Sequence, residues 1–165
     1  MADYLVKLYD LPELHPVLES MEKQGVTIRR ALTPEKHLVT QWVKEHFSDH
    51  WASECEAGLA RHPVSCIIAT VSEKQEDGKE KSKMVGFACY DATMKGFFGP
   101  TGVDPEMRGK GIGKALLLAC MHALREEGYG YGIIGGAGPV EFYKKTVGAI
   151  EIPGSSPGIY KGMMR

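Results

Sequence analysis

The sequence predicts a three-layer α/β domain, of the α+β kind, whose mixed sheet is mostly antiparallel. Short β-rich apolar runs alternate with amphipathic helical segments along the chain. No repeat or linker divides the 165 residues, and this length is sufficient for one domain with a sizeable hydrophobic core. We therefore expect one domain over residues 26–165, preceded by an N-terminal extension over residues 1–25.

The N-terminal extension contains one predicted helix. Residues 10–13, Asp-Leu-Pro-Glu, have the pattern of a capping box, and Gly25 is a typical stop signal. The apolar residues between these points share one helical face: Leu14, Val17, Leu18 and Met21. This helix is expected to come before the first strand of the main fold.

The main fold begins with a predicted strand over residues 26–31, which two helices follow. Thr33-Pro34 is typical of a helix start, and Ser48 or Asp49 begins the second helix, which ends before Pro63. The first of these helices is amphipathic. Its apolar face is formed by Leu38, Val39, Trp42, Val43 and Phe47.

The next strands are predicted from apolar runs rich in β-branched and aromatic residues. Ser65 to Val71 and Met84 to Tyr90 form two such runs, and the charged residues 72–83 between them are interpreted as a solvated hairpin loop. The following strand, Phe97 to Val103, contains Pro100, which cannot donate a ladder hydrogen bond. We therefore expect a bulge or a splayed pair at that strand.

The C-terminal third completes the alternation of helices and strands. A buried helix is predicted from about Ile112 to Glu127, and a glycine-rich strand over Tyr131 to Gly135. Pro139 then opens a further helix, because proline is favoured in the first turn. A closing hairpin is predicted last, over Ala149 to Ile152 and Ile159 to Met163.

The most informative segment is the turn between strand and helix within residues 103–116. The first four N–H groups of a helix have no intrahelical partner, and the helix dipole places partial positive charge at that end. Arg108 and Lys110 add positive charge, and three glycines leave no Cβ between the amides and a ligand. The turn therefore favours an anion, although a solvated basic connector is an alternative. Its glycines are Gly109, Gly111 and Gly113.

Two common phosphate motifs are excluded. A Walker A loop requires G-x4-G-K-[ST], whereas Gly109-Lys110 is followed by Gly111. A G-x-G-x-x-G string does occur at residues 130–135, but it follows a helix and has the composition of a strand. A dinucleotide fingerprint lies between a strand and a helix, so we interpret this match as chance.

The segment Arg108-Gly109-Lys110-Gly111-Ile112-Gly113 resembles the acyl-CoA pyrophosphate loop, R/Q-x-x-G-x-G/A, of the GNAT superfamily of N-acetyltransferases. Residues 142–149, Phe-Tyr-Lys-Lys-Thr-Val-Gly-Ala, resemble a second family motif at the expected place downstream. The resemblance extends over roughly Val26 to Met164. It implies acetyl-CoA as co-substrate, and a sheet in which the fourth strand of the family fold diverges from the fifth. Thr101 and Val103 would then offer backbone groups to the pantetheine arm.

The resemblance also implies direct attack of an amine on the acetyl thioester. A backbone amide near Val103 would polarise the carbonyl, and Tyr143 matches the tyrosine that gives a proton to the departing thiolate. No base is assigned, because the strand at residues 97–103 has no carboxylate. Gly136 stands where the family often has an asparagine that contacts the cofactor. Weak alternatives for the base are His46, His50, Glu54 and Asp91.

The acceptor is expected to be a small-molecule or peptide amine, and the sequence does not choose among amino sugars, polyamines, antibiotics and peptides. Its site would be bordered by the first two helices and the last hairpin. Candidate lining residues are Trp51, Ser155, Ser156 and Tyr160. Two alternatives stay open: a non-catalytic acyl-CoA sensor that binds a partner protein, and, more remotely, a nicotinamide enzyme built on the string at residues 130–135.

Composition excludes other classes of partner. Lys plus Arg number 20 and Asp plus Glu 21, and the resulting net charge of −1 does not favour nucleic-acid or membrane-surface binding. The four cysteines have no C-x-x-C spacing, so we expect packed thiols and no metal site. No targeting or spanning segment is evident, which predicts a cytoplasmic location. Nothing in the sequence excludes a homodimer.

Overall fold

The computed structural model describes residues 1–165 and contains one seven-stranded sheet. The strand order is β2-β3-β4-β5-β6-β1-β7, and every neighbouring pair is antiparallel except β5 with β6. The predicted mixed, mostly antiparallel sheet is therefore confirmed. The strands are β1 (Tyr4–Lys7), β2 (Val26–Arg30), β3 (Cys66–Lys74), β4 (Glu80–Tyr90), β5 (Phe97–Val103), β6 (Tyr131–Ile134) and β7 (Ile150–Glu151).

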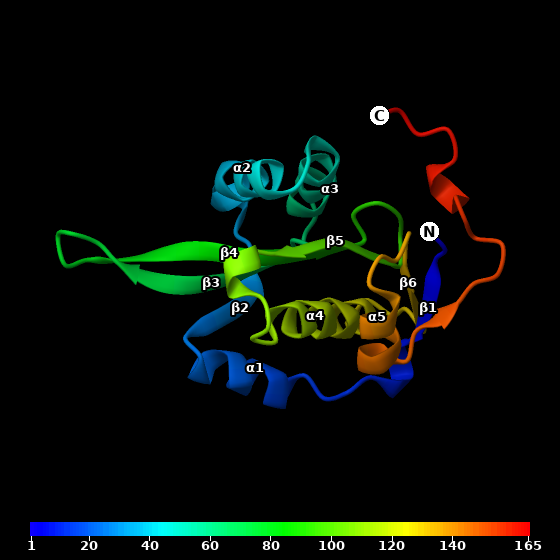
Figure 1. The fold of residues 1–165 in the computed structure, drawn as a ribbon, viewed down its shortest axis with the longest axis horizontal. Coiled ribbons are helices and arrows are strands. Elements are labelled where there is room, and N and C mark those ends of the chain that lie inside the picture. The colour runs from blue at the N-terminus through cyan, green and yellow to red at the C-terminus, as the bar shows by residue number, and fades with distance from the viewer.

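Helices cover both faces of the sheet, as the three-layer prediction requires. Figure 1 shows α2 and α3 on one face and α1, α4 and α5 on the other. The helices are α1 (His15–Lys23), α2 (Lys36–His46), α3 (Asp49–Leu59), α4 (Ile112–Glu126) and α5 (Val140–Val147). Short 3-10 turns occur at Leu8–Asp10, Thr33–Glu35, Pro105–Met107 and Gly158–Tyr160. No helix is long and apolar enough to cross a membrane.

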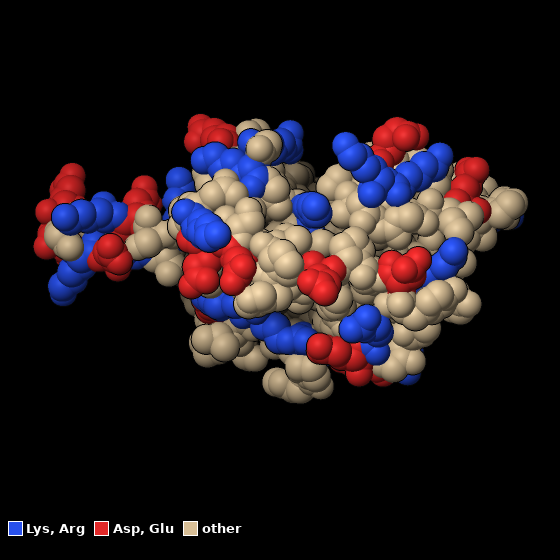
Figure 2. All heavy atoms as spheres, turned by 90° about the horizontal axis from the view of Figure 1, so that it is seen from below, with Lys and Arg blue, Asp and Glu red and all other residues tan.

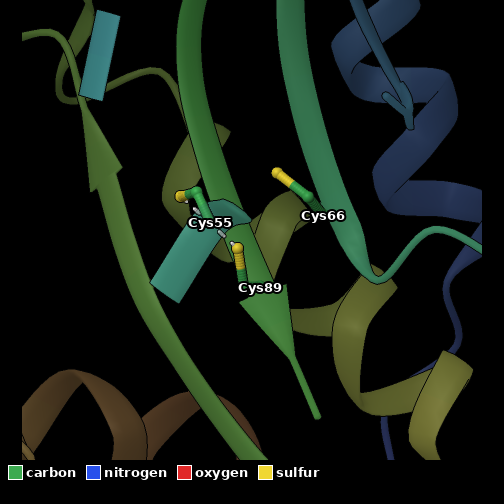
Figure 3. A group of neighbouring side chains, drawn as sticks. All are labelled: Cys55, Cys66 and Cys89. Carbon is green, nitrogen blue, oxygen red and sulfur yellow. Dashed lines mark hydrogen bonds between the residues drawn. The ribbon is translucent and has the colours of Figure 1, made fainter. Parts of the chain in front are cut away.

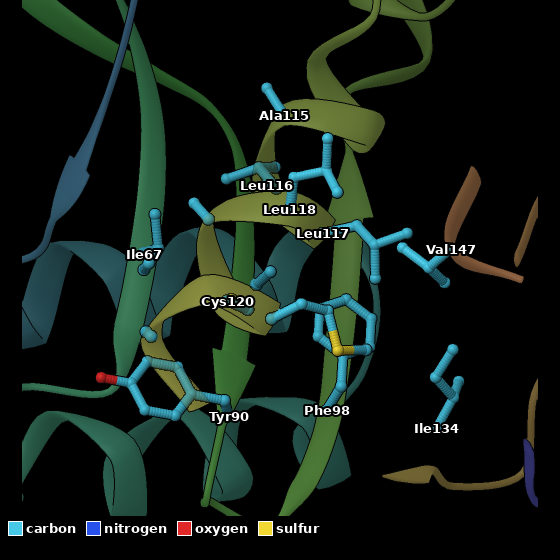
Figure 4. Packing of buried hydrophobic residues seen from close by; sticks show 14 of the residues in the cluster. Ile67, Tyr90, Phe98, Ala115, Leu116, Leu117, Leu118, Cys120, Ile134 and Val147 are labelled. Carbon is cyan, nitrogen blue, oxygen red and sulfur yellow. The ribbon is translucent and has the colours of Figure 1, made fainter. Parts of the chain in front are cut away.

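Helix α4 forms the centre of the larger hydrophobic core. Leu116, Leu117, Leu118 and Leu124 are all at most 1% exposed, because the helix packs on the sheet with one side and against α1 with another. Figure 4 shows Leu116, Leu117 and Leu118 of this helix in the same buried cluster as Tyr90 and Phe98 of the strands. Full burial of one leucine side chain contributes about 1.5–3 kcal/mol. Such packing fixes the position of the helix and of the turn that precedes it.

A second, smaller core lies between the sheet and the pair α2 and α3. Ser48 caps α3 by accepting a hydrogen bond from Trp51 N at 3.2 Å, as the predicted helix start requires. Val39 and Val43 of α2 are buried against this face, but Leu38, which was predicted to join them, is 60% exposed. The buried face of α2 is therefore narrower than the sequence pattern indicates. Trp51 packs against Phe87, with ring centroids 6.2 Å apart.

The N-terminal segment differs from the prediction in two ways. Strand β1 was not predicted, and it lies between β6 and β7 in the sheet. The expected capping box at residues 10–13 is wrong, because α1 begins after Leu14 without a side-chain cap and has Pro16 in its first turn. A strand of four residues carries too short an alternation to stand out in the sequence.

The charged residues 72–83 are largely strand and not the predicted loop. Strands β3 and β4 continue their ladder outward, so that Glu73 lies opposite Lys81 and Lys74 opposite Glu80. Opposite charges at facing positions stabilise such a pair. Figure 2 shows charged side chains of both signs on this projecting hairpin. The sequence predicts a loop here because both faces of these exposed strand ends are polar, so no apolar run or alternation indicates a strand.

The predicted closing hairpin is wrong. Only β7 is a strand, and it pairs with β1 instead of with the segment at residues 159–163. That segment instead begins inside the 3-10 turn Gly158–Tyr160, and Gly154, Gly158 and Gly162 all have positive φ angles. Left-handed backbone at regular intervals does not allow a continuous extended strand. The C-terminal segment therefore folds back as turns, on the same side of the sheet as α3 (Figure 1).

Candidate active site

Strands β5 and β6 lie side by side over only two residue pairs. Phe97 is opposite Ile133 and Phe98 is opposite Ile134, and beyond these pairs the remainder of β5 is hydrogen-bonded to β4 alone. The predicted divergence of these two strands is therefore confirmed. It leaves one side of residues 99–103 without a neighbouring strand.

A bulge in β5 decides which backbone groups face this opening. Ala88 is opposite Thr101 and Tyr90 is opposite Phe98, so β5 has one more residue than β4 between these pairs. The predicted bulge is confirmed.

Beyond the bulge, the direction of the backbone groups follows from one hydrogen bond. Asp104 N donates to Val85 O of β4 at 2.8 Å. Because backbone groups alternate in direction along a strand, Gly102 also faces β4, whereas Thr101 and Val103 direct their N–H and C=O groups into the opening. The prediction that these two residues offer free amides and carbonyls agrees with this geometry.

The turn that leads from β5 to α4 has the backbone conformation for which its glycines were singled out. Gly109 has a φ of +82° and Gly111 a φ of +88°, and Gly111 is the N-cap residue of α4. A side chain at either position would be strained in this left-handed conformation. Gly113 has no such requirement, and its Cβ would meet nothing closer than Val103 Cγ2 at 3.9 Å. The absence of a side chain at Gly113 therefore leaves open space beside the first turn of the helix.

Six consecutive amides in this turn are free to bind an anion. The N–H groups of residues 109–114 donate to no acceptor within the protein, and Ile112 begins the helix among them. Arg108 and Lys110 are exposed, and neither forms an ion pair. Free amides, the helix dipole and two exposed cationic residues therefore occur together in this turn.

Helix α1 supports the anion-binding turn from the side. Gln24 Nε2 donates to Lys110 O at 3.2 Å, and Met21 Cε lies 3.3 Å from the position that a Cβ on Gly111 would occupy. The N-terminal helix thus holds the turn in place without using any of its free amides. No local pattern in the sequence indicates this contact.

Tyr143 of α5 lies beside the point where β5 and β6 separate. Its ring packs edge-on against Phe98, with centroids 6.2 Å apart, and against Phe142 at 5.3 Å. The side chain is 5% exposed, and this burial raises the pKa of Tyr143 to about 12. The phenol is therefore protonated over the whole physiological range, and its hydroxyl makes no hydrogen bond within the protein.

A polar cluster of Glu54, Thr93 and Tyr160 lies on the face of the sheet opposite Tyr143. Thr93 Oγ1 donates to Glu54 Oε1 at 2.5 Å, and Tyr160 lies close enough to Thr93 and Glu54 for both to affect the pKa of its hydroxyl. Burial raises the pKa of Glu54 above its ordinary value. Glu54 and Tyr160 were predicted separately, as a candidate base and a lining residue. Thr93 was not predicted, because the sequence has no signal for it.

Phe97 connects this cluster to the split between the strands. A Cβ on Gly135 would lie 2.9 Å from the Phe97 ring and 3.1 Å from the Tyr160 hydroxyl, so both groups meet at the end of β6. Phe98, the next residue, points to the opposite face and contacts Tyr143. The Tyr143 phenol on one face and the polar cluster on the other therefore flank the place where β5 and β6 separate.

Other residues predicted for the acceptor site have structural contacts. Trp51 packs in the smaller core, and Ser155 accepts a hydrogen bond from Asp3 N at 2.7 Å. Ser156 accepts one from the N-terminal amino group at 3.2 Å. Gly136 N donates to Asp3 Oδ1 at 2.8 Å, so this amide is also occupied.

The remaining candidates for a base are likewise held by neighbours. His46 contacts the backbone oxygen of Trp42, and His50 that of Met164. Asp91 accepts a hydrogen bond from Gly96 N at 2.6 Å and forms an ion pair with Arg61 at 3.4 Å. Asp91 therefore organises the loop between β4 and β5. Glu54 is left as the carboxylate best placed beside the strand opening.

A separate cavity of about 200 Å³ lies between α1 and α4. Leu14, Ile28, Arg30, His122 and Glu126 are among the residues that line it. None of the residues singled out above as candidate site residues belongs to its lining. We therefore assign the candidate active site to the strand opening and not to this cavity.

Comparisons with known proteins agree with this geometry. The family model described as acetyltransferase (GNAT) family matches residues 28–149, which include β5, the anion-binding turn and Tyr143. No curated protein matches the chain. The matched range begins after β1 and α1, so these elements lie outside it.

Solved structures share the fold at low sequence identity. One is a GCN5-related glucosamine N-acetyltransferase region of a fungal multi-domain GH3 β-N-acetylglucosaminidase, with a TM-score of 0.70 and 16% identity over 92% of this chain. Another is a GCN5-related N-acetyltransferase from Sphaerobacter thermophilus, with a TM-score of 0.66 and 19% identity over 92% of this chain. The chain spans 19% of the first protein and 48% of the second.

Proposed function

Because the chain belongs to the GNAT family of acetyltransferases, we propose that it moves an acetyl group from acetyl-CoA to a primary amine by direct attack. The observation that carries the proposal is the run of free amides at residues 109–114, next to an opening between two strands that Tyr143 borders. The amides suit a pyrophosphate and the opening suits an extended amide-containing arm. A phenol beside that opening suits a thioester sulfur.

In this proposal the backbone binds most of acetyl-CoA. The pyrophosphate accepts hydrogen bonds from the amides between Gly109 and Gly113, and Arg108 and Lys110 add charge-assisted contacts of about 1.5–3 kcal/mol each. The pantetheine arm pairs with the backbone of Thr101 and Val103 as an added strand would. These contacts orient the thioester toward the point where β5 and β6 separate.

The acetyl transfer needs three groups from the protein. The amine nitrogen attacks the carbonyl carbon, a C–N bond forms, and the C–S bond breaks. The Val103 amide stabilises the carbonyl oxygen, and Tyr143 donates a hydrogen bond, and in the end a proton, to the departing sulfur. With a pKa of about 12, Tyr143 is a weaker acid than a thiol at about 8.5, so hydrogen bonding to the developing charge is its main contribution.

The remaining task is to take a proton from the amine, and we assign it to Glu54. This carboxylate belongs to the cluster with Thr93 and Tyr160 on the face of the sheet opposite Tyr143, so the two groups would act on the incoming amine and the departing sulfur separately. Its raised pKa makes it a better proton acceptor than an exposed glutamate. Tyr160 and Thr93 would line the amine site beside it.

The acceptor class is tested with a panel of amines, by following the release of free CoA from acetyl-CoA. The panel contains amino sugars, polyamines, aminoglycosides and peptides. Glucosamine is included because the fungal structure of similar fold is a glucosamine N-acetyltransferase region, although that likeness at 16% identity extends to the fold only. We expect at least one primary amine to be acetylated at a rate well above hydrolysis. A cytoplasmic location stays part of this proposal.

The second candidate is a non-catalytic acyl-CoA sensor, which the absence of a carboxylate on β5 favours. The two functions make different predictions for the same panel. Stabilisation by acetyl-CoA without CoA release from any amine would support the sensor. Absence of both stabilisation and turnover would contradict both functions.

A further inference from the structure

Three cysteine thiols from separate elements meet between helix α3 and the sheet (Figure 3). Cys55 lies on α3, and Cys66 and Cys89 are directly opposite each other on β3 and β4. All three Sγ atoms lie within 4.8 Å of one another, and those of Cys55 and Cys89 are 3.6 Å apart. Each residue is 0% exposed, and none forms a disulfide. Packed thiols were predicted, but not that three of them converge.

The three sulfurs are placed closely enough to bind one atom. A thiolate sulfur lies about 2.3 Å from a bound zinc ion, so three sulfurs around one trigonal centre of that size are about 4 Å apart. The observed separations require side-chain shifts of less than about 1 Å to reach that arrangement. Rotation about the Cα–Cβ bonds can supply such shifts without moving the backbone.

The donor set and its surroundings select the kind of atom. No histidine or carboxylate joins the group, whereas structural zinc requires four ligands. Val39, Val43, Leu59 and Phe87 belong to the same buried cluster, so a charged complex would be costly there. Three thiolates around Cu(I) carry a net charge of −2. Three thiolates around a trivalent centre are neutral, which the apolar surroundings favour.

We propose that Cys55, Cys66 and Cys89 form a three-thiol site for a trivalent thiophilic element, represented by As(III). Arsenous acid, As(OH)3, reacts with the three thiols by forming three As–S bonds and breaking three As–O bonds. Each thiol proton leaves with one hydroxide as water, so no electron is transferred and no net charge enters the core.

The site would connect the helix on one face with two strands of the sheet. Cys55 is the neighbour of Glu54, so a bound As(III) would also fix the part of α3 that carries this carboxylate. As(III) should bind the folded protein more tightly than the unfolded chain, because folding already brings the three sulfurs together. It should therefore raise the melting temperature.

The test uses the full-length protein, reduced with a phosphine and then incubated with sodium arsenite. We expect native mass spectrometry to find one arsenic atom per chain, and X-ray absorption at the arsenic edge to find three sulfur neighbours and no oxygen. The melting temperature should rise by roughly 5–10 °C at arsenite concentrations one hundred times the Kd. Cys120→Ala is the matched control, because Cys120 is equally buried but does not belong to the group. This variant should bind as the parent does.

Cys66→Ala should lose the three-sulfur complex while keeping a two-thiol site for phenylarsine oxide, which has only two exchangeable positions. The proposal is overturned if the folded parent protein binds no arsenic, or if the absorption spectrum shows oxygen neighbours. Arsenite binding by Cys66→Ala as strong as that of the parent would also overturn it. Because the spectrum of the parent decides by itself, a variant that fails to fold does not prevent a conclusion.

Discussion

The two halves of the candidate site are built in different ways. The turn at residues 108–113, the proposed anion site, is one continuous, exposed piece of backbone whose relevant features are glycines and free amides. The split between β5 and β6 is bordered by side chains from α3, α5 and the C-terminal turn, which are far apart in the sequence. The turn is therefore formed by one short segment of the chain. The split exists only after the sheet has formed.

This difference predicts that the two halves can be disabled separately. Changes in the turn should weaken acetyl-CoA binding with little effect on the chemical step, because backbone contacts hold the nucleotide end of the molecule. Changes at the split should slow the chemical step with little effect on acetyl-CoA binding. The following four predictions run from the largest effect to the smallest; the first three test this separation, and the fourth concerns a site outside both halves.

The largest effect is expected for Tyr143→Phe. The substitution removes the hydroxyl and little volume, so kcat should fall by about 10²–10³-fold, the usual cost of losing one hydrogen bond to a charge that develops in the transition state. The affinity for acetyl-CoA, measured by calorimetric titration, should stay within about twofold of the parent. The assay is steady-state release of CoA with the amine that the panel identifies.

The pH dependence provides the control for this prediction. Because burial raises the pKa of Tyr143 to about 12, the parent should show no alkaline loss of kcat from this group up to about pH 10. The reduction of kcat in Tyr143→Phe relative to the parent should become smaller as the pH rises above the thiol pKa of about 8.5, because the thiolate then departs more easily without a proton donor. A variant with parental kcat, with chemistry shown to limit the rate, removes Tyr143 from the mechanism.

The next effect is expected for Glu54→Gln. Without the carboxylate the amine must lose its proton to water, so kcat/KM at neutral pH should fall by roughly 10²-fold. In the parent, activity should rise with pH through the raised pKa of Glu54, and the variant should lack this step. The loss should become smaller as the pH approaches the pKa of the amine itself. A merely structural role would give a loss that does not change with pH.

Glu56→Gln is the matched control, because Glu56 is exposed on the same helix. It should keep the parental pH profile. Both variants should bind acetyl-CoA as the parent does, which separates a wrong choice of base from a wrong assignment of the cofactor. Equal profiles for the two variants would contradict the role of Glu54.

A smaller effect, on binding alone, is expected for Gly111→Val. The new side chain would strain a residue with a φ of +88° and occupy space beside the free amides. We expect acetyl-CoA affinity to fall by at least about tenfold, or about 1.4 kcal/mol, in calorimetric titration. Gly113→Val should act in the same direction through its bulk alone.

Gly78→Val is the matched control for backbone strain. Gly78 has a φ of +82° in the β3–β4 hairpin, and no atom lies within 4 Å of its Cβ position. This variant should lose stability as Gly111→Val does, yet bind acetyl-CoA normally. Normal binding by a folded Gly111→Val protein would place the pyrophosphate elsewhere and favour the solvated connector.

The smallest effect is expected far from both halves, at the ion pair between Arg29 and Glu35. The two side chains form hydrogen bonds of 2.8 and 2.7 Å, and Glu35 also accepts one from Leu32 N. Since the pair is partly exposed, Glu35→Gln should cost about 0.5–1 kcal/mol, which lowers Tm by roughly 1–4 °C. Acetyl-CoA binding and kcat should not change.

The pH dependence of this small effect has a definite sign. The bond to Arg29 lowers the pKa of Glu35, so its stabilisation is present above the unfolded pKa of about 4.3 and is lost as the pH falls through the lower, folded value. The difference in Tm between parent and variant should therefore vanish in acid. A difference that is the same at pH 7 and at pH 3 would contradict this account.

The sequence determined the features whose cause is local. The free amides at the start of α4 follow from the glycines around Arg108, and the bulge in β5 follows from Gly99 and Pro100, because these residues act on their own backbone. Helix α4 and strand β6 were likewise predicted within a residue or two, since ten residues of α4 are buried and its apolar pattern is strong. The backbone geometry of the proposed anion site could be predicted for these reasons.

Only the tertiary structure decided which distant residues meet. Glu54, Thr93 and Tyr160 form one cluster because α3, the β4–β5 loop and the C-terminal turn lie on the same face of the sheet, and nothing in their spacing indicates it. The convergence of the three thiols depends in the same way on the register of β3 against β4. Strand β1 became part of the sheet because β6 offered it an edge. Such contacts depend on packing across the whole chain, which no local pattern contains.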